Sequence, residues 1–147
     1  RFFTVYGPWG RPDMAYFKFV NHIKNNQIIK IFNYGDHKRD FTYVDDITEG
    51  IYLAHLKVNN IFKKKIIPFE ILNLGNTNSI SLTRLVKTLE KQLFKKARIK
   101  FVKKQDGDML ITKSNINRAK RLLNYNPKIS FEKGIKKFVD WHNNYYK

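Results

Sequence analysis

The first six residues place the strongest constraint on the fold. Arg1 to Tyr6 alternate too little between apolar and polar side chains for a strand with one face in water. Strands of parallel sheets are covered on both faces and have such dense apolar runs. Residues 1–6 therefore predict a buried strand of a parallel sheet, already in progress at Arg1. A loop with two glycines and two prolines, Gly7-Pro8-Trp9-Gly10-Arg11-Pro12, ends this strand.

Beyond the loop, short apolar runs alternate with amphipathic segments. The runs that predict strands lie at 28–32, 41–44, 69–74 and 99–102. Helices are predicted at 13–25, 46–58, 81–93, 114–124 and from 130 onward, with a frayed end over 143–147. The predicted N-caps are Asp13, Asp46 (in capping-box spacing with Glu49), Ser81, Ser114 and Ser130.

The predicted second helix has its apolar residues at helical spacing, and we expect Ile47, Ile51, Ala54 and Val58 to face the core. The loop after it, residues 59–68, contains the lysine run 63–65. Strands and helices are mixed, but no uninterrupted series of strand, helix and strand appears. We therefore expect an α/β piece and not a whole doubly wound domain.

The composition indicates a packed, cysteine-free chain. Hydrophobic residues make up 42% of the sequence and aromatic residues 15%, which supports a core and argues against disorder. The absence of cysteine excludes disulfides, thiolate metal ligands and cysteine nucleophiles, and it fits a reducing compartment. No apolar stretch approaches membrane-spanning length, and no signal peptide is visible. We expect a cytoplasmic protein without a membrane partner.

The charge of the chain is strongly positive. The formal net charge is +17, which on its own suggests a surface for nucleic acid. The basic residues are scattered, however, and most of them are lysines in a sequence rich in Ile, Lys and Asn. The codons of these three residues consist largely or wholly of A and T. We therefore favour a composition set by codon usage, with solvated lysine faces, over a nucleic-acid partner.

A self-contained catalytic site is not evident in the sequence. The histidines at 22, 37, 55 and 142 lack the spacing of metal ligands, so we expect no metal site. His55 and His142 are expected at the rims of amphipathic helices. No Gly-x-Gly-x-x-Gly or other phosphate-binding glycine loop is present. The Asp45-Asp46 pair is better explained by Asp46 as a helix cap than by a metal.

Four stretches stand out by their order and spacing. They are 1–15, 34–46, 73–76, and Gly107-Asp108 followed by 118–123 and 125–127. Together they resemble the C-terminal half of the extended short-chain dehydrogenase/reductase family, the NAD-dependent epimerases and dehydratases. The run Arg-Asp-Phe-x-Tyr-Val-Asp-Asp at 39–46 is typical of the family. The run Thr-Val-Tyr-Gly-Pro-Trp-Gly-Arg-Pro-Asp-Met at 4–14 is especially similar to UDP-glucuronate 4-epimerases. The resemblance covers essentially all of residues 1–147.

The resemblance implies a fold and an activity. It implies that residues 1–147 form one partial domain, the α/β substrate-binding region, with the N-terminal Rossmann domain absent from this chain. Family members bind NAD on that domain and the nucleotide sugar in the cleft beside the smaller one. The NAD oxidises C4 of the sugar to a ketone, the sugar rotates, and hydride returns to the other face. The catalytic Tyr-x-x-x-Lys lies upstream of Arg1 in the family, and neither Tyr16 nor Tyr43 is followed by lysine four residues on. We therefore expect no catalytic residue here.

The resemblance also implies roles near the reacting sugar. Phe3 matches the position beside the nicotinamide. Thr4 and Arg11 match positions that face the sugar carboxylate in the uronate branch, and a hydroxyl with a guanidinium suits a carboxylate. The prolines and glycines of the intervening loop are expected to bring Arg11 back over the strand end that carries Thr4.

Three further residues are implied on the nucleotide side. Phe32 lies in the segment that lines the uracil pocket of the family. Arg39 matches an arginine that contacts the diphosphate. Asp108 matches an acceptor for the ribose hydroxyls. Each residue also has a simpler interpretation: Arg39 as a surface ion pair, Arg11 as a brace for its loop, and Phe3 and Phe32 as core.

The expected function is interconversion of UDP-glucuronate and UDP-galacturonate by the complete protein. The alternatives are a neighbouring nucleotide-sugar epimerase, dehydratase or decarboxylase, or a non-catalytic truncated remnant. Whether this chain alone is an enzyme stays open. The implied partners are a UDP-sugar substrate and, for the complete protein, a second copy in a homodimer.

Overall fold

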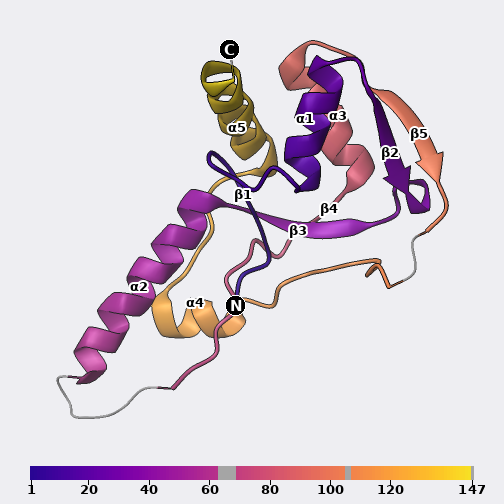
Figure 1. The fold of residues 1–147 in the computed structure, drawn as a ribbon. Coiled ribbons are helices and arrows are strands. Elements are labelled where there is room, and N and C mark those ends of the chain that lie inside the picture. Colours follow the sequence, from indigo (N-terminus) through magenta and orange to yellow (C-terminus); the bar gives the residue numbers. More distant parts are fainter. Residues whose placement is uncertain (63–68, 105–106, 147) are drawn as a thin grey trace.

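The computed structural model describes residues 1–62, 69–104 and 107–146, and Figure 1 shows their arrangement. Its elements, in chain order, are β1 (Thr4–Tyr6), α1 (Ala15–Lys24), β2 (Ile28–Phe32), the short 3-10 helix η1 (Asn33–Gly35), β3 (Lys38–Tyr43), α2 (Val44–Phe62), β4 (Ser79–Ser81), α3 (Leu82–Leu93), β5 (Arg98–Val102), α4 (Asn117–Leu123) and α5 (Phe131–Tyr145). The predicted α/β class is confirmed. The Lys63–Lys65 run lies outside the described residues.

Two small sheets organise the described chain. The first has the order β1-β3-β4, with β1 parallel and β4 antiparallel to β3. The second pairs β2 with β5 in parallel, from Ile28–Arg98 to Phe32–Val102. The opening residues thus enter a parallel pairing as predicted, with Thr4 opposite Phe41. Burial is complete only at the end of this strand, at Tyr6, while Phe2 stays exposed.

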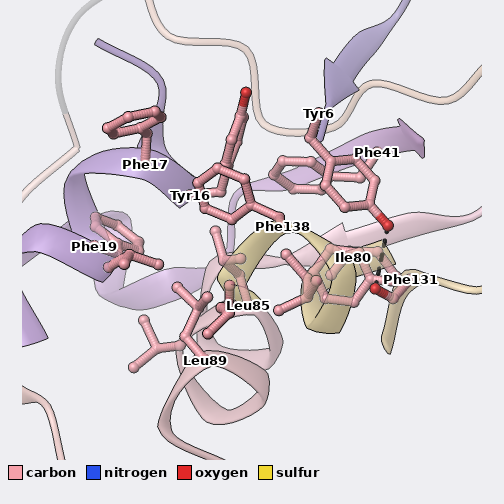
Figure 2. Close-up of a cluster of buried hydrophobic side chains, with 14 of the residues drawn as sticks. Tyr6, Tyr16, Phe17, Phe19, Phe41, Ile80, Leu85, Leu89, Phe131 and Phe138 are labelled. Carbon is pink, nitrogen blue, oxygen red and sulfur yellow. Dashed lines mark hydrogen bonds between the residues drawn. The ribbon is translucent and has the colours of Figure 1, made fainter. Parts of the chain in front are cut away.

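The main core lies where α1, α3 and α5 meet the strands (Figure 1). Figure 2 shows that its centre is strongly aromatic, with Tyr6 among Phe41, Phe131 and Tyr16. The Tyr6 hydroxyl donates a hydrogen bond to the carbonyl oxygen of Phe131 at 3.1 Å, so this buried polar group has a partner. Burial raises the pKa of Tyr6, and its phenol stays protonated.

A second apolar cluster joins α2 to α4. It contains Ile47, Leu74, Ile116, Ala119, Leu123 and Tyr125. Leu74 reaches the first sheet, because it forms an isolated parallel bridge with Phe2. The predicted strand 69–74 is otherwise wrong, since only Leu74 pairs and Phe69 is exposed. In α2, Ile47 is buried as expected, whereas Ile51 is exposed.

Two of the predicted helix caps are confirmed. Ser81 accepts a hydrogen bond from the backbone N–H of Arg84, and Ser130 accepts one from Lys133. The caps at Asp13, Asp46 and Ser114 are wrong. The side chain of Asp13 pairs with Arg11, that of Asp46 accepts from the N–H groups of Lys128 and Ile129, and that of Ser114 bonds to Asp40.

Two expectations at the C-terminal end are also corrected. Helix α5 continues to Tyr145, so the segment from Asn143 does not fray as predicted. His142 lies in the core and not at the rim, because its ring packs against Phe17 and Phe138. An amide oxygen of Asn21 accepts a hydrogen bond from its Nε2 at 2.9 Å.

Candidate functional site

The strand β1 and the loop after it form one wall of a pocket of about 640 Å³. Phe3, Thr4 and Arg11 line this pocket together. Gly10 lets the loop fold closely onto α1, because a Cβ at Gly10 would stand 1.8 Å from the Tyr16 hydroxyl. Desolvation raises the pKa of Tyr16 to about 12, so this hydroxyl remains protonated at neutral pH. The sequence-predicted residues nearest the reacting sugar thus share one pocket.

A second pocket of about 210 Å³ adjoins the first. Thr4 and Met14 line both pockets, so the two are continuous along β1. Arg39 and Asp108 line the second pocket, although 69 positions separate them in the sequence. Five of the six predicted binding residues are therefore brought to one connected depression.

An ion pair dominates the second pocket. The Arg39 Nη2 atom donates to Oδ1 of Asp108 at 2.7 Å, and these side chains are 22% and 37% exposed. The other carboxylate oxygen, Oδ2, lies 3.3 Å from Nδ1 of His37. Arg39 is thus a partly buried residue that lines a pocket, and its ion-pair partner is Asp108, not Asp36 or Asp40. The N–H groups of a guanidinium that face a pocket are suited to binding an anion such as phosphate.

Asp108 reaches this position because its segment runs along β3. The N–H of Lys38 donates to the carbonyl oxygen of Leu110 at 2.8 Å, and the N–H of Thr112 donates to that of Lys38 at 3.0 Å. These bonds make an isolated parallel bridge between Lys38 and Ile111. Arg39 adds a contact from Nη1 to the Leu110 carbonyl at 3.5 Å. The backbone itself therefore fixes the pocket wall opposite β1.

Asp40 anchors the end of the same segment. Its fully buried carboxylate accepts hydrogen bonds from the N–H groups of Asn76, Thr77 and Ser114 at 2.8, 3.0 and 2.9 Å. The hydroxyl groups of Thr42 and Ser114 donate to it as well. A buried carboxylate needs such donors in place of water. Asp40 is consequently a structural centre, one residue away from Arg39 on the opposite face of β3.

Arg11 lies in a different position from the one expected. It does not fold back over Thr4 as a buried guanidinium. Its side chain is 75% exposed and its Nε donates to Oδ1 of Asp13 at 3.0 Å. This bond raises the pKa of Arg11 and lowers the pKa of Asp13. The loop brings the arginine to a carboxylate only two residues away, and the two exposed side chains pair.

Phe32 is the predicted binding residue that the pockets leave out. It is half-buried at the end of β2, opposite Val102, and it lines neither pocket. Its neighbour Tyr34 has φ 53° and stacks on Phe101, with ring centroids 6.4 Å apart. The segment around Phe32 thus presents aromatic rings at the edge of the second sheet.

His37 and Thr112 belong to the depression but were missed in the sequence. His37 is 2% exposed and lines the second pocket, and Thr112 lines the first. The only signal for His37 in the sequence was its place two residues before Arg39, since it lies just outside β3 and strand periodicity does not apply to it. Thr112 gave none, because its position depends on the pairing of 110–112 with β3.

Neither a metal site nor a membrane-spanning helix is found among the described residues. No group of three or more His, Asp or Glu side chains in residues 1–62, 69–104 and 107–146 could hold a metal ion. No helix in the same ranges is both long and apolar enough to span a membrane.

Comparisons with known proteins agree on one family. The model of the NAD dependent epimerase/dehydratase family matches residues 1–75. UDP-glucuronate 4-epimerase 4 of Arabidopsis thaliana is 46% identical over 156 residues, which cover 99% of this chain and 36% of the relative. UDP-glucuronate 4-epimerase of Thermodesulfobacterium geofontis is 43% identical over 142 residues, covering 96% of this chain and 41% of the relative.

A solved structure gives the same result at the level of the fold. The crystal structure of UDP-glucuronic acid 4-epimerase from Bacillus cereus, in complex with UDP-glucuronic acid and NAD, superimposes with a TM-score of 0.86 and 34% identity. That match covers 99% of this chain and 45% of the Bacillus chain. This chain therefore spans less than half the length of these relatives and corresponds to their C-terminal half. On this evidence, the chain belongs to the NAD dependent epimerase/dehydratase family.

Proposed function

We propose that this chain is the substrate-binding part of an NAD-dependent UDP-sugar 4-epimerase that acts on UDP-glucuronate. One observation carries the proposal: Thr4, Arg39 and Asp108 line one pocket, and Thr4 joins it to the pocket of Phe3 and Arg11. A nucleotide sugar needs an anion site and a sugar site in line with each other. The connected depression offers both, with the charged groups at one end and the loop arginine at the other.

At the charged end, Arg39 binds the diphosphate and Asp108 accepts from the ribose. Arg39 keeps its guanidinium at the pocket surface through the bond from Nη1 to the Lys38 carbonyl at 3.0 Å. A planar guanidinium with several N–H donors suits phosphate oxygens. Phe32 lies outside the two pockets, so we assign it an indirect role, at the edge of the base-binding segment.

At the sugar end, the Thr4 hydroxyl and Arg11 bind the carboxylate of the uronate. Arg11 must first leave Asp13, and the cost is small because both side chains are exposed and solvent screens their attraction. The substrate carboxylate then competes with Asp13 for the same N–H groups of the Arg11 guanidinium. Asp13 thus holds the arginine near the pocket rim until an anion arrives.

Phe3 is the residue that we assign to the cofactor. It is half-buried and lines the larger pocket, so one face of its ring is available for a flat nicotinamide. Bound NAD would accept a hydride from the sugar and return it. The sequence has no phosphate-binding glycine loop, so we infer that an N-terminal Rossmann part holds most of the cofactor and provides the catalytic Tyr-x-x-x-Lys.

The remaining proposals concern the whole protein. We infer that residues 1–147 act as one partial domain and that the complete protein is a cytoplasmic homodimer without a nucleic-acid partner. The absence of cysteine supports a reducing compartment.

Substrate choice tests the proposed function directly. The complete protein is expected to prefer UDP-glucuronate to UDP-glucose by about 100-fold in kcat/KM, because the uronate carboxylate accepts a charge-assisted hydrogen bond from Arg11, worth up to about 3 kcal/mol, that a hydroxymethyl group cannot replace. Arg11→Ala should remove most of this preference by harming the uronate reaction alone. Steady-state kinetics with both substrates measure it.

Arg84→Ala provides the matched control for that substitution. Arg84 is also a half-exposed arginine paired with one carboxylate, that of Glu132 at 2.6 Å, but it lies outside both pockets. Its substitution should leave both reactions unchanged. If Arg11→Ala slows the two substrates equally, Arg11 only braces its loop, and the uronate assignment fails.

A further inference from the structure

His37 and Arg39 divide a single carboxylate between them. Arg39 Nη2 bonds to Oδ1 of Asp108 at 2.7 Å, and Nδ1 of His37 lies 3.3 Å from Oδ2. Each oxygen therefore faces a different cationic or donor group. Both side chains reach Asp108 from the start of β3, His37 from just before the strand and Arg39 from its second residue.

His37 is built into this position. Its side chain is 2% exposed, and its carbonyl oxygen accepts the N–H of Leu82 at the start of α3 at 3.2 Å. Within residues 1–62, 69–104 and 107–146, its Nε2 has no hydrogen-bond partner. The Asp108 carboxylate is thus the polar group that the buried ring faces. A leucine would fill the same space without burying an unpaired nitrogen, so packing alone does not explain a histidine here.

The contact of His37 with Oδ2 changes what Arg39 can do. Arginine and carboxylate groups frequently pair through two parallel hydrogen bonds, which would occupy two guanidinium N–H groups. Here Nη1 is used by the carbonyl oxygens of Lys38 and Leu110, at 3.0 and 3.5 Å. In the described part of the chain, Nη2 bonds to Oδ1 of Asp108 alone. A guanidinium has five N–H donors, and among the described residues Nε of Arg39 bonds to no group. The Nε–H beside Nη2 therefore remains for a ligand.

We propose that His37 is a positioning residue for anion binding. By holding Oδ2 of Asp108, it keeps the Arg39–Asp108 pair single and leaves the Nε–H of Arg39 for a diphosphate in the pocket. Without His37, the carboxylate turns its second oxygen to this Nε–H and uses up that donor. The inference rests on the proposed function, because the anion is the diphosphate of the nucleotide sugar.

Three substitutions at one position separate the contact of Nδ1 with Asp108 from the packing of the ring. The amide nitrogen of asparagine is the same number of bonds from Cα as Nδ1 of histidine. The amide nitrogen of glutamine corresponds in the same way to Nε2, and leucine has no donor. In the complete protein, His37→Asn should bind UDP within about twofold of the wild type, since it restores the contact to Oδ2. His37→Gln and His37→Leu should each weaken UDP about tenfold or more, the effect of losing a hydrogen bond to a charged group.

Calorimetry with UDP as the probe measures these affinities, and kinetics should show a raised KM with kcat unchanged. A double substitution shows whether His37 acts through Asp108. In an Asp108→Asn background, His37→Leu should cause no further loss of UDP affinity, whereas independent effects would multiply. Equal affinity of the three His37 variants, or multiplying effects, would overturn the proposal.

A readout without ligand separates this proposal from the proposed function. ¹⁵N NMR of the histidine rings should show Nδ1 of His37 protonated, since it faces a carboxylate, and Asp108→Asn should change that signal. If the wild-type protein binds no UDP, the proposed function is wrong. The tautomer of the His37 ring then decides alone whether His37 holds Asp108. A wild-type ring that is protonated only on Nε2 contradicts our inference, and this measurement does not depend on whether the variants fold.

Discussion

At the scale of single residues, β3 changes its role from one position to the next. Arg39 faces a pocket and Asp40 is fully buried, because successive side chains of a strand point to opposite faces. One residue binds a ligand in our proposal, and its neighbour holds the surrounding chain in place. Substitutions at 39 and 40 should therefore have different effects, the first on substrate and the second on stability.

Substitution of Arg39 should weaken substrate binding. Arg39→Ala in the complete protein is expected to raise KM by an amount corresponding to about 1.5–3 kcal/mol, the range for a hydrogen bond to a charged group. Arg39→Lys should recover only part of this loss, because lysine lacks the planar fork. Steady-state kinetics with UDP-glucuronate provide the measurement. An Ala variant with unchanged KM would show that the arginine serves only Asp108.

Substitution of Asp40 should destabilise the fold. Asp40→Asn keeps the shape but removes charge and acceptor capacity from a site that receives five hydrogen bonds, from Thr42, Asn76, Thr77 and both donors of Ser114. We expect a loss of about 2–4 kcal/mol in the free energy of unfolding, measured in urea. Asp13→Asn, an exposed acid that pairs with Arg11, should leave the unfolding midpoint unchanged. Equal midpoints for the two variants would refute the structural role of Asp40.

At the scale of elements, the packing of α5 on α1 depends on a neutral histidine. His142 is buried between the two helices, and its Nε2 donates to the side chain of Asn21 in α1. Desolvation, with a smaller effect of Lys24, lowers the pKa of His142 from 6.5 to about 4. The folded state therefore resists protonation at a pH where the unfolded chain accepts a proton.

This difference predicts an acid-sensitive contact. Because the folded pKa lies below the unfolded one, the contribution is complete above pH 6.5 and is lost as the pH falls toward 4. The loss amounts to about 3 kcal/mol, from about 1.4 kcal/mol for each pKa unit. His142→Gln keeps a donor at the position of Nε2 and does not titrate, so its stability should vary less with pH. The free energy of unfolding of both proteins is measured in urea between pH 4 and 7. If it changes with pH by the same amount in the wild type and in the variant, this explanation is contradicted.

The elements also show which sequence signals can be trusted. Ser81 and Ser130 cap their helices as predicted, whereas Asp46 and Ser114 bond to residues far away in the chain. A local capping pattern fixes the side chain only where no tertiary partner competes for it. The strand predicted at 69–74 was wrong for a related reason. Apolar residues there indicate burial, and the described chain offers a pairing partner to Leu74 alone.

The candidate site was predictable to a similar extent. The resemblance to the family indicated Thr4, Arg39 and Asp108, which line one pocket. Periodicity alone could not bring Arg39 to Asp108, since their contact depends on the backbone pairing of the 110–112 segment with β3. The orientation of Arg11 was missed because Asp13, only two residues away, accepts a hydrogen bond from its guanidinium.

At the scale of the whole molecule, large apolar side chains remain exposed at several places. Those before β1, before Leu74 and on α2 are Phe2, Phe69, Ile71, Ile51 and Tyr52. Figure 1 shows α2, the segment leading to Leu74 and the N-terminus in the lower part of the view. Exposed apolar surface commonly marks an interface. We propose that these five side chains face the N-terminal part of the complete protein.

The chain alone should therefore lack activity and be prone to aggregation. We expect no epimerase activity and no stoichiometric NAD binding from the purified chain, together with binding of an apolar fluorescent dye and a tendency to aggregate. Linking it to the N-terminal part should remove the dye signal and restore activity. Turnover by the isolated chain above a blank would refute the division of roles.

The parallel contact between β3 and the 110–112 segment has a consequence for folding. It closes a loop of about seventy residues, and the bond from Arg39 to Asp108 spans 69 positions. The entropy lost in closing so long a loop must be recovered by contacts that form afterwards. Each of the helices α1 and α3 can form from local contacts first, whereas the pocket needs this long-range contact, so the pocket should order after the helices have formed. A nucleotide that contacts both walls of the pocket would then slow the separation of β3 from the 110–112 segment, and with it the unfolding of this region.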